Sequence, residues 1–300
     1  MNITASDNSY RSGYVALVGT PNVGKSTLLN HMLGQKVSII TPRPQTTRHK
    51  ILGIKTTRRS QIIYVDTPGY HHSHKRALNR YMDNVLATTI ADVDVIVLMV
   101  SGMNWTEADQ RMLDRVSSHP RLILAVNKVD RIADKRPLLP HIENLSGKAS
   151  FQHIIPLSAK TGDNVGQLEQ EVIALLPHSP PYYPDDQITD RSERFIAAEI
   201  VREELMKLLK DELPYLVTVE IESYADKNDR VHIGALIWVE QERHKAMVIG
   251  KDGDMLKCVG TRARKSLEQM MGTRVFLELW VKVQQDWTDD ERTLNRLGYN

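Results

Sequence analysis

The sequence predicts two consecutive domains: an α/β domain with a mostly parallel sheet and helices on both faces, followed by a smaller α+β domain. Through the first 176 residues, short apolar runs typical of strands alternate with helical patterns, as in a sheet with crossover helices. Four prolines then fall within residues 177–184, a composition that disfavours regular structure. We therefore expect one domain at 1–178, a linker at 179–190 and a second domain at 191–300.

Each element follows from a local pattern. In the first domain we expect strands at 14–18, 51–57, 61–66, 93–100, 122–127 and 154–157, and helices at 27–33, 75–90, 106–117 and 164–176. Only Arg58, Arg59 and Ser60 separate the second and third strands, which is too few for a helical crossover, so this pair should form an antiparallel hairpin at one edge. In the second domain we expect a helix at 192–209, strands at 216–223 and 231–240, a glycine-containing loop, a helix ending at 271 and a strand at 275–283.

Composition limits the function only weakly. The formal net charge is +2 and the isoelectric point is near 8.5, so overall charge does not indicate a nucleic-acid ligand. The single cysteine, Cys258, cannot close an intramolecular disulfide, and the polar start of the chain lacks the apolar core of a secretory signal. The most apolar run, residues 93–100, contains Asp94 and is far shorter than the roughly 18 residues that span a bilayer. We therefore expect a cytoplasmic protein.

Residues 19–26 match the phosphate-loop pattern Gly-x-x-x-x-Gly-Lys-Ser, between an expected strand and an expected helix. Glycines let backbone N–H groups turn towards phosphates, and Lys25 can reach the β- and γ-phosphates. The Ser26 hydroxyl can ligate Mg²⁺ at a helix N-terminus, whose dipole favours anions. The nucleotide contacts expected here are Gly19, Asn22, Val23, Gly24, Lys25, Ser26 and Thr27.

A second element follows the strand expected at 61–66. Asp66 is placed as a carboxylate on the metal side of the phosphates, and the N–H of Gly69 can approach a γ-phosphate. An isolated Asp-Thr-Pro-Gly would be an ordinary turn, but its position after the phosphate loop favours a nucleotide site. We expect nucleotide contacts from Asp66, Thr67, Pro68 and Gly69, and catalytic roles for Lys25, Asp66 and Gly69.

The third element, Asn127-Lys128-Val129-Asp130, closes another strand and distinguishes guanine from adenine. Guanine offers an N1–H and an exocyclic amine, and the Asp130 carboxylate can accept from both, whereas adenine offers neither arrangement. An acceptor left unpaired by the wrong base supports discrimination of up to roughly 10⁴–10⁵ in other enzymes. We expect Asn127, Lys128 and Asp130 to bind the base. An adenine-nucleotide enzyme is the alternative that these residues disfavour.

Two further segments complete the expected nucleotide site. Ser158, Ala159 and Lys160 follow the next strand and resemble the segment that supports the base in GTPases. Between the phosphate loop and Asp66, one of two threonines should close over Mg²⁺ and the γ-phosphate when GTP is bound. We favour Thr47 over Thr46, and assign it a metal-binding and catalytic role beside Ser26.

The motifs resemble, in this order, those of translation-factor-related GTPases, and in detail those of the Era family. The resemblance rests on Gly-Thr-Pro-Asn-Val-Gly-Lys-Ser-Thr, Pro-Gln-Thr-Thr-Arg-His, Tyr-Val-Asp-Thr-Pro-Gly, Ala-Val-Asn-Lys-Val-Asp and Leu-Glu-Leu-Trp-Val-Lys-Val, and covers about residues 14–299. It implies GTP hydrolysis to GDP, with Mg²⁺ as cofactor. Tyr70 stands where Ras-like enzymes carry the water-positioning glutamine. The family shares a bulky apolar residue there, which implies another route, through backbone groups and a monovalent cation such as K⁺ near Asn22.

This departure predicts slow basal turnover, on the order of the 10⁻⁴ s⁻¹ of unassisted Ras or somewhat faster. His71, His72 and His74 follow directly and are tempting acid–base groups. Histidines clustered on a polar loop are more often solvated surface residues. We therefore assign them no role.

Residues 248–253 contain a Gly-x-x-Gly loop of the kind by which KH domains clamp about four nucleotides of single-stranded RNA. Any turn can supply this tetrapeptide, but a β-run precedes it and a helical segment with Lys257, Arg262, Arg264 and Lys265 follows it. With the helix and two strands in front, this resembles a type II KH domain. The expected RNA contacts are Ile249, Gly250, Lys251, Asp252, Gly253 and Lys257, although carboxylates at Asp252 and Asp254 oppose phosphate binding.

The Era resemblance implies binding to the small ribosomal subunit, near the 3′ end of its RNA, and a role in its assembly. The proline-rich linker and a nucleotide-sensitive segment at 38–50 suggest a switch that binds RNA better with GTP than with GDP. The main alternative is a GTP-gated adaptor whose second domain binds a protein or a membrane surface. Peripheral association with the inner face of the cell membrane would use the helix at 192–209, whose apolar stripe is more simply a domain core.

Overall fold

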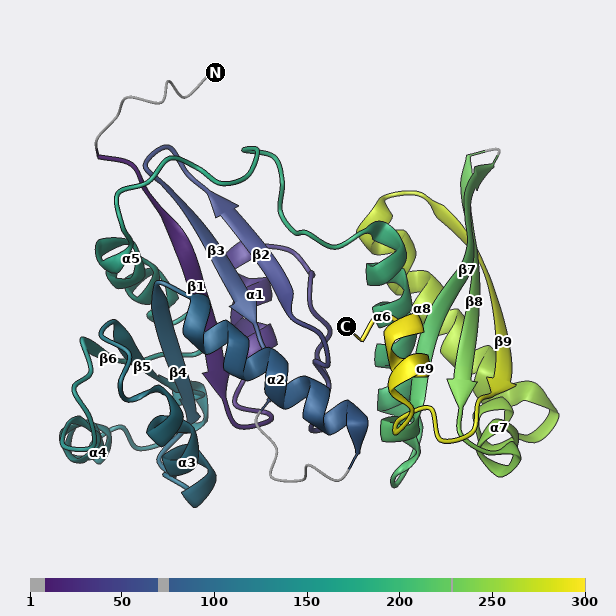
Figure 1. The fold of residues 1–300 in the computed structure, drawn as a ribbon, viewed down its shortest axis with the longest axis horizontal. Helices are drawn as coiled ribbons and strands as arrows, with labels where there is room; N and C mark the ends of the chain where they lie inside the picture. Colours follow the sequence, from purple (N-terminus) through teal and green to yellow (C-terminus); the bar gives the residue numbers. More distant parts are fainter. Residues whose placement is uncertain (1–8, 70–75, 228, 300) are drawn as a thin grey trace. The chain divides into compact units, whose positions relative to one another are not determined.

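The computed structural model describes residues 9–69, 76–227 and 229–299. Within these residues the chain forms two compact units (Figure 1). The first unit takes residues 9–38, 47–69 and 82–190. The second takes 39–46, 76–81 and the described residues from 191 onwards. The two short segments 39–46 and 76–81 therefore pack with the C-terminal part of the chain, although they follow elements of the first unit.

A sheet with the strand order β2-β3-β1-β4-β5-β6 forms the centre of the first unit. Its strands are β1 (Arg11–Gly19), β2 (Ile51–Thr56), β3 (Ser60–Asp66), β4 (Val95–Ser101), β5 (Leu122–Asn127) and β6 (His153–Pro156). The pair β2–β3 is antiparallel and the other pairs are parallel. This confirms the mostly parallel sheet with a hairpin at one edge.

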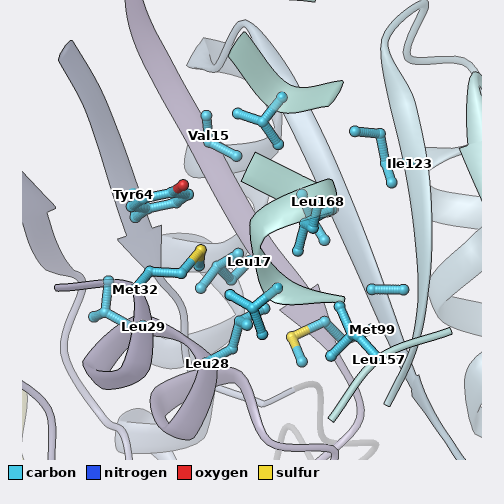
Figure 2. Packing of buried hydrophobic residues seen from close by; sticks show 14 of the residues in the cluster. Val15, Leu17, Leu28, Leu29, Met32, Tyr64, Met99, Ile123, Leu157 and Leu168 are labelled. Carbon is cyan, nitrogen blue, oxygen red and sulfur yellow. The ribbon is translucent and has the colours of Figure 1, made fainter. Parts of the chain in front are cut away.

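Helices cover both faces of this sheet, and each face has its own apolar core. On one face α1 (Lys25–Leu33) and α5 (Val165–Leu175) bury Leu28, Leu29 and Leu168 against alternate side chains of the strands, as Figure 2 shows. On the other face lie α2 (Ala77–Asp92), α3 (Glu107–Val116) and α4 (Leu138–Ser146). Strands buried on both faces require nearly continuous apolar sequences, which explains why these strands could be predicted from the sequence.

The second unit consists of a three-stranded sheet with helices on one face, within the part of the chain that the structure describes. The strands are β7 (Val217–Lys227), β8 (Arg230–Val239) and β9 (Arg274–Val283), in that order, with β7–β8 antiparallel and β8–β9 parallel. Helix α6 (Glu193–Leu208) and helix α8 (Asp254–Met271) share the core with the sheet (Figure 1). This order of elements confirms the predicted KH fold.

Three short helices were not predicted from the sequence: α4, α7 (Glu242–Ile249) and α9 (Glu291–Arg296). The expected loop before α8 thus contains a helix. Few side chains of these helices are buried: Leu145 in α4, His244 and Val248 in α7, and Thr293 and Leu294 in α9. Helices α7 and α9 have only eight and six residues, so little apolar periodicity can repeat in their sequences. Helix α4 does carry Leu138, Ile142 and Leu145 at helical spacing, and this signal was missed.

In the described residues, the structure contains no helix long and apolar enough to cross a membrane. The apolar side chains of α6, among them Ala197, Ile200, Val201 and Leu205, lie in the core of the second unit. The apolar stripe of this helix is therefore explained by packing.

Candidate functional site

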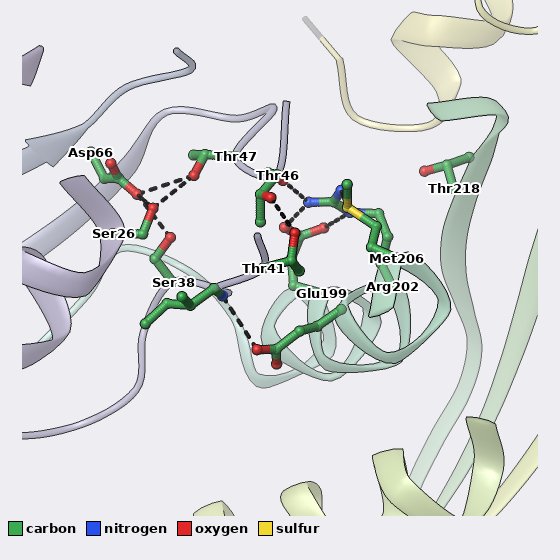
Figure 3. Close-up of polar contacts among 12 residues, drawn as sticks. Ser26, Ser38, Thr41, Thr46, Thr47, Asp66, Glu199, Arg202, Met206 and Thr218 are labelled. Carbon is green, nitrogen blue, oxygen red and sulfur yellow. Dashed lines mark hydrogen bonds and ion pairs between the residues drawn. The ribbon is translucent and has the colours of Figure 1, made fainter. Parts of the chain in front are cut away.

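Hydroxyl groups from three segments converge on one carboxylate at the end of β3. Asp66 is fully buried, and its Oδ2 accepts hydrogen bonds from Ser26 Oγ at 2.7 Å, Ser38 Oγ at 2.8 Å and Thr47 Oγ1 at 3.3 Å (Figure 3). Ser26 Oγ and Thr47 Oγ1 are themselves 2.9 Å apart. Thr46 Oγ1 instead contacts Thr41 Oγ1 at 2.6 Å. Of the two threonines considered from the sequence, Thr47 thus lies with the metal-side residues.

The other carboxylate oxygen, Asp66 Oδ1, is buried and has no hydrogen-bond partner among the described residues. A buried acceptor without a partner is costly, so this atom is suited to a ligand that supplies positive charge. A carboxylate with two hydroxyls beside it is the hard oxygen set that Mg²⁺ prefers. These residues therefore fit a magnesium ion.

Burial dominates the protonation of the two charged groups here. It lowers the pKa of Lys25 to about 8, although nearby Asp66 favours the charged amine. It also raises the pKa of Asp66, despite the hydrogen bonds from Ser26, Ser38 and Thr47. Lys25 Nζ donates to the carbonyls of Gly19 at 2.9 Å and Thr20 at 3.1 Å. The site thus holds a desolvated amine at the turn of the phosphate loop, where an anion would favour its charged form.

The phosphate loop needs its glycines for space as well as for backbone conformation. Gly24 has φ 109°, and a Cβ at that position would lie 2.3 Å from Asn127 Nδ2. A Cβ at Gly19, which has φ 150°, would lie 2.4 Å from the Met99 carbonyl oxygen. Asn22 also has a left-handed backbone, with φ 63°. These backbone conformations turn the chain sharply between β1 and α1.

The base-side residues are tied to the phosphate loop and to each other. Asn127 Nδ2 donates to the Val23 carbonyl at 2.7 Å, and Asn127 Oδ1 accepts from the Ala159 N–H at 2.9 Å. Asp130 accepts from Ser158 Oγ at 2.7 Å, and this hydrogen bond lowers the pKa of the carboxyl group. Asp130 is exposed while Ser158 is fully buried. An ionised, oriented acceptor thus faces solvent where guanine could approach.

The remaining nucleotide-site residues lie around these two centres. Lys128 has φ 66°, and its Nζ donates to the Asn22 carbonyl at 2.5 Å. Thr67 Oγ1 donates to the Leu17 carbonyl at 2.8 Å, and a Cβ at Gly69 would lie 3.1 Å from Pro21 Cα. Thr27 belongs to α1, Pro68 lies between Thr67 and Gly69 after β3, and exposed Lys160 helps to lower the pKa of Asp130.

Two residues of this site were missed by sequence reasoning. Ser38 Oγ contacts Asp66, and the Asn30 side chain holds the segment before it, accepting from the N–H groups of Val37 at 2.9 Å and Ser38 at 3.0 Å. Asn30 Nδ2 also donates to the Ser38 carbonyl, at 2.7 Å. Asn30 lies within a helix and Ser38 follows a valine, and neither belongs to a sequence motif that would have identified it. Tyr70, His71, His72 and His74 lie outside the described residues.

In the second unit, the Gly-x-x-Gly loop precedes α8 directly. Gly250 has φ 77° and Gly253 has φ 82°, while Asp252 between them is also left-handed, with φ 53°. A Cβ at Gly250 would lie 2.7 Å from Met255 Cβ. Asp254 is the first residue of α8, where a carboxylate favours the helix dipole. Ile249 is the last residue of α7, Lys251 lies between the two glycines, and Lys257 lies in the first turn of α8.

A groove of about 420 Å³ continues from this loop along α8 and β9. Its lining combines apolar side chains with cationic and hydroxyl groups: Gly253, Leu256, Lys257, Gly260, Thr261, Arg264, Leu277 and Leu279. Apart from Gly253 and Lys257, these residues were not among the expected RNA contacts, because the groove forms between two elements. Arg264, which pairs with Glu268 at 2.9 Å, also lines a neighbouring hollow of about 1010 Å³ with Arg230, Arg274, Asp229 and Glu268. The lining suits a chain of phosphates and bases.

Comparison with known proteins divides the chain into the same nucleotide-binding and RNA-binding parts. A family model described as a 50S ribosome-binding GTPase matches residues 14–128, and a KH-domain model matches residues 212–288. GTPase Era of Azotobacter vinelandii is 51% identical over 294 residues, covering 98% of each chain. GTPase Era of Marinobacter nauticus is 53% identical, covering 96% of this chain and 95% of the relative.

Solved structures resemble the whole chain as well. One, described as Era in complex with MgGDPNP and nucleotides 1506–1542 of 16S ribosomal RNA, has a TM-score of 0.93 and 38% identity, covering 97% of this chain and 99% of that one. An Era variant of Aquifex aeolicus bound to GDP.AlF4⁻ has the same TM-score and identity, with coverage of 96% and 99%.

Proposed function

This chain belongs to the Era family of GTPases, and we propose that it is a GTP-controlled RNA-binding protein that acts in assembly of the small ribosomal subunit. It hydrolyses GTP to GDP and phosphate. We assign residues 1–178 to the GTPase domain, 179–190 to a linker and 191–300 to a type II KH domain. We propose as RNA ligand the single-stranded 3′ region of small-subunit ribosomal RNA, the molecule present in the related complex.

In the nucleotide site, Lys25 and the phosphate-loop amides bind the β- and γ-phosphates. Ser26, Thr47 and Asp66 would hold Mg²⁺, which neutralises charge on the transferred phosphoryl group when it is bound. The Gly69 N–H approaches the γ-phosphate. Each of these residues acts by position and electrostatics, which is the main contribution of a protein to phosphoryl transfer. We expect slow basal turnover, on the order of 10⁻⁴ s⁻¹ or somewhat faster.

Asn127, Lys128 and Asp130 select guanine, with Ser158, Ala159 and Lys160 supporting the base. The oriented Asp130 carboxylate supports this assignment. We also propose a monovalent cation such as K⁺ near Asn22, whose backbone is left-handed at φ 63°. We place the protein in the cytoplasm, with peripheral association at the inner face of the cell membrane.

The observation that carries the RNA-binding proposal is the loop of residues 250–253, followed directly by the groove along α8. Left-handed glycines at both ends let the backbone approach phosphates closely. Lys257, Thr261 and Arg264 then line the groove beside the apolar Leu277 and Leu279, which suits bases as well as phosphates. Asp252 in the loop is expected to reduce the affinity.

The test is binding of a short single-stranded RNA, with the sequence of the 16S 3′ end, to the full-length protein carrying a GTP analogue. We expect binding that weakens steeply with salt, with a log–log slope of about −0.7 for each phosphate contact. Gly250→Asp and Gly253→Asp should abolish it. Gly298→Asp is the matched control, because Gly298 is also left-handed, at φ 85°, with no atom within 4 Å of an added Cβ.

If folded wild-type protein binds no RNA, or if both loop variants bind as tightly as the control, the RNA proposal is wrong. The GTPase activity would stand. Binding to a protein partner or to anionic vesicles, unaffected by the loop variants, would favour the adaptor alternative.

A further inference from the structure

We infer that Arg202 of α6 is a positioning residue for GTP hydrolysis. Its guanidinium holds the carbonyl of Thr46 and thereby fixes the next residue, Thr47, among the metal-side oxygens of the nucleotide site. The inference rests on the role proposed above for Thr47. It gives a function to a buried ion pair that the nucleotide site itself does not use.

Arg202 is 1% exposed, and each of its nitrogens has a defined partner (Figure 3). Nε and Nη2 each donate to one carboxylate oxygen of Glu199, both at 2.6 Å, which is the bidentate geometry typical of arginine. Nη1 contacts the Met206 sulfur at 3.2 Å. Nη2 makes one further hydrogen bond, to the Thr46 carbonyl at 2.5 Å. Glu199 orients the guanidinium, and the guanidinium holds a backbone carbonyl.

The carbonyl of Thr46 belongs to the peptide bond that leads into Thr47. Peptide bonds are planar and rigid, so holding this oxygen restricts where Thr47 can lie. Thr47 is 6% exposed, and its Oγ1 contacts Ser26 Oγ and Asp66 Oδ2. One peptide unit thus has a buried arginine at its carbonyl and a threonine of the nucleotide site at its nitrogen.

The rest of the segment 39–46 is also held by α6 and the residue that follows it. The N–H of Ile40 donates to Glu203 Oε1 at 3.3 Å. Arg43 donates from Nε to the Met206 carbonyl at 2.6 Å and from Nη2 to the Leu209 carbonyl. Within the segment, Thr46 Oγ1 donates to the Arg43 carbonyl at 2.8 Å. The segment therefore has a defined conformation when it reaches Thr47.

A purely stabilising role would not need this arrangement. Replacing a buried ion pair by apolar side chains of similar volume is often neutral for stability or favourable. An apolar pair could not hold a carbonyl, and a lysine cannot form the planar fork that reaches a carboxylate and a carbonyl at once. The third contact, to Thr46, is the one that explains why an arginine suits this position.

The test compares Arg202→Lys and the double variant Glu199→Gln/Arg202→Met with wild-type full-length protein. The double variant removes both charges of this ion pair together. We expect single-turnover hydrolysis at saturating GTP to slow about tenfold to a hundredfold in each, the effect of losing a hydrogen bond from a charged donor. The Mg²⁺ midpoint should rise, and GTP-analogue affinity should fall while GDP affinity changes by less than about twofold.

Arg115→Lys is the matched control. Arg115 pairs with Asp83 at 2.7 Å in the first unit, and its side chain is 31% exposed. This substitution should leave hydrolysis, the Mg²⁺ midpoint and the preference for the GTP analogue over GDP unchanged. Circular dichroism and thermal melting establish that each variant is folded, and the double variant decides if Arg202→Lys does not fold.

Thr47→Ala separates the role of Arg202 from the role of Thr47. If Thr47→Ala slows hydrolysis while both folded Arg202 variants keep wild-type rates and nucleotide preference, Arg202 is structural and this inference is wrong. If Thr47→Ala has no effect either, the proposed metal-side role of Thr47 is wrong. Slower hydrolysis with a shifted Mg²⁺ midpoint in all three variants supports the inference.

Discussion

At the residue scale, Lys25 and Asp66 are opposite charges in a place where neither reaches bulk water. Lys25 is 6% exposed and Asp66 is fully buried, and burial moves both pKa values towards the neutral forms. The pair is therefore poorly stabilised by itself, and a phosphate with its magnesium ion would supply the missing charges. This makes the protonation of Lys25 a direct report on nucleotide binding.

Nucleotide binding should take up a proton above pH 8. In the nucleotide-free protein the pKa of Lys25 is about 8. Bound phosphates favour the charged amine, so its pKa rises on binding. Affinity should consequently fall as pH increases above about 8, and proton uptake should be smaller at pH 7. Calorimetry in two buffers of different ionisation enthalpy, at pH 7.5 and 8.5, measures this. Equal uptake at the two pH values would contradict it.

Asp130→Asn should move base preference from guanine towards xanthine. The asparagine replaces one acceptor oxygen by a donor amide, which suits the 2-oxo group of xanthine and leaves the guanine amine unpaired. GTP affinity should fall at least about a hundredfold, within the range known for unpaired polar groups in specificity sites. Competition binding of GDP and XDP measures it, with Asp134→Asn as control because Asp134 is an exposed carboxylate paired with Arg136. Unchanged guanine selectivity would disprove the assignment.

At the element scale, the sequence was informative where physical constraints repeat along it. Strands buried on both faces require apolar runs, and phosphates require glycines and a lysine at a fixed spacing, so both could be predicted. Short helices such as α7 could not, and neither could the contacts of Ser38 with Asp66 or of Arg202 with Thr46. These contacts join residues 28 and 156 positions apart, and no local pattern in the sequence indicates them.

The loop of residues 250–253 should respond differently to alanine at its two glycines. Gly253→Ala places a Cβ in open space, so its cost is mainly the left-handed backbone, about 1 kcal/mol. Gly250→Ala adds a contact of 2.7 Å with Met255 Cβ, and should destabilise the second unit more and weaken RNA binding further. Denaturant unfolding and RNA titration measure both. Equal effects of the two substitutions would show that the loop adapts.

Helix α3 offers a test of local stability. Thr106 caps it: its Oγ1 accepts from the Asp109 N–H at 3.2 Å, and Asp109 Oδ2 accepts from the Thr106 N–H at 3.0 Å. Thr106→Ala should reduce the free energy of unfolding by about 1 kcal/mol. Thr88→Ala, at an exposed position within α2 where Thr88 Oγ1 bonds to the Asn84 carbonyl, should be close to neutral. Equal losses in the two variants would argue against the cap.

At the scale of the whole molecule, the chain has a formal charge of only +2, so its cationic groups act by their placement. Lys25 serves the phosphate loop, while Lys257 and Arg264 line the groove of the second unit. The segments 39–46 and 76–81 pack within the second unit, although Thr47 of the nucleotide site follows segment 39–46 directly. The nucleotide site and the second unit are therefore joined by a continuous stretch of chain, as a nucleotide-dependent switch would require.

GTP binding and RNA binding should be coupled, and one thermodynamic cycle measures this coupling. RNA affinity is measured for full-length protein carrying GTP analogue or GDP, and the affinity of each nucleotide is measured with and without RNA. We predict tighter RNA binding in the GTP form, by about 5-fold to 150-fold, and an equal gain in the preference for GTP over GDP when RNA is present. Equal RNA affinity in the two nucleotide states would show that the protein is not a GTP-controlled RNA-binding switch, because a ligand that does not discriminate two states cannot shift them.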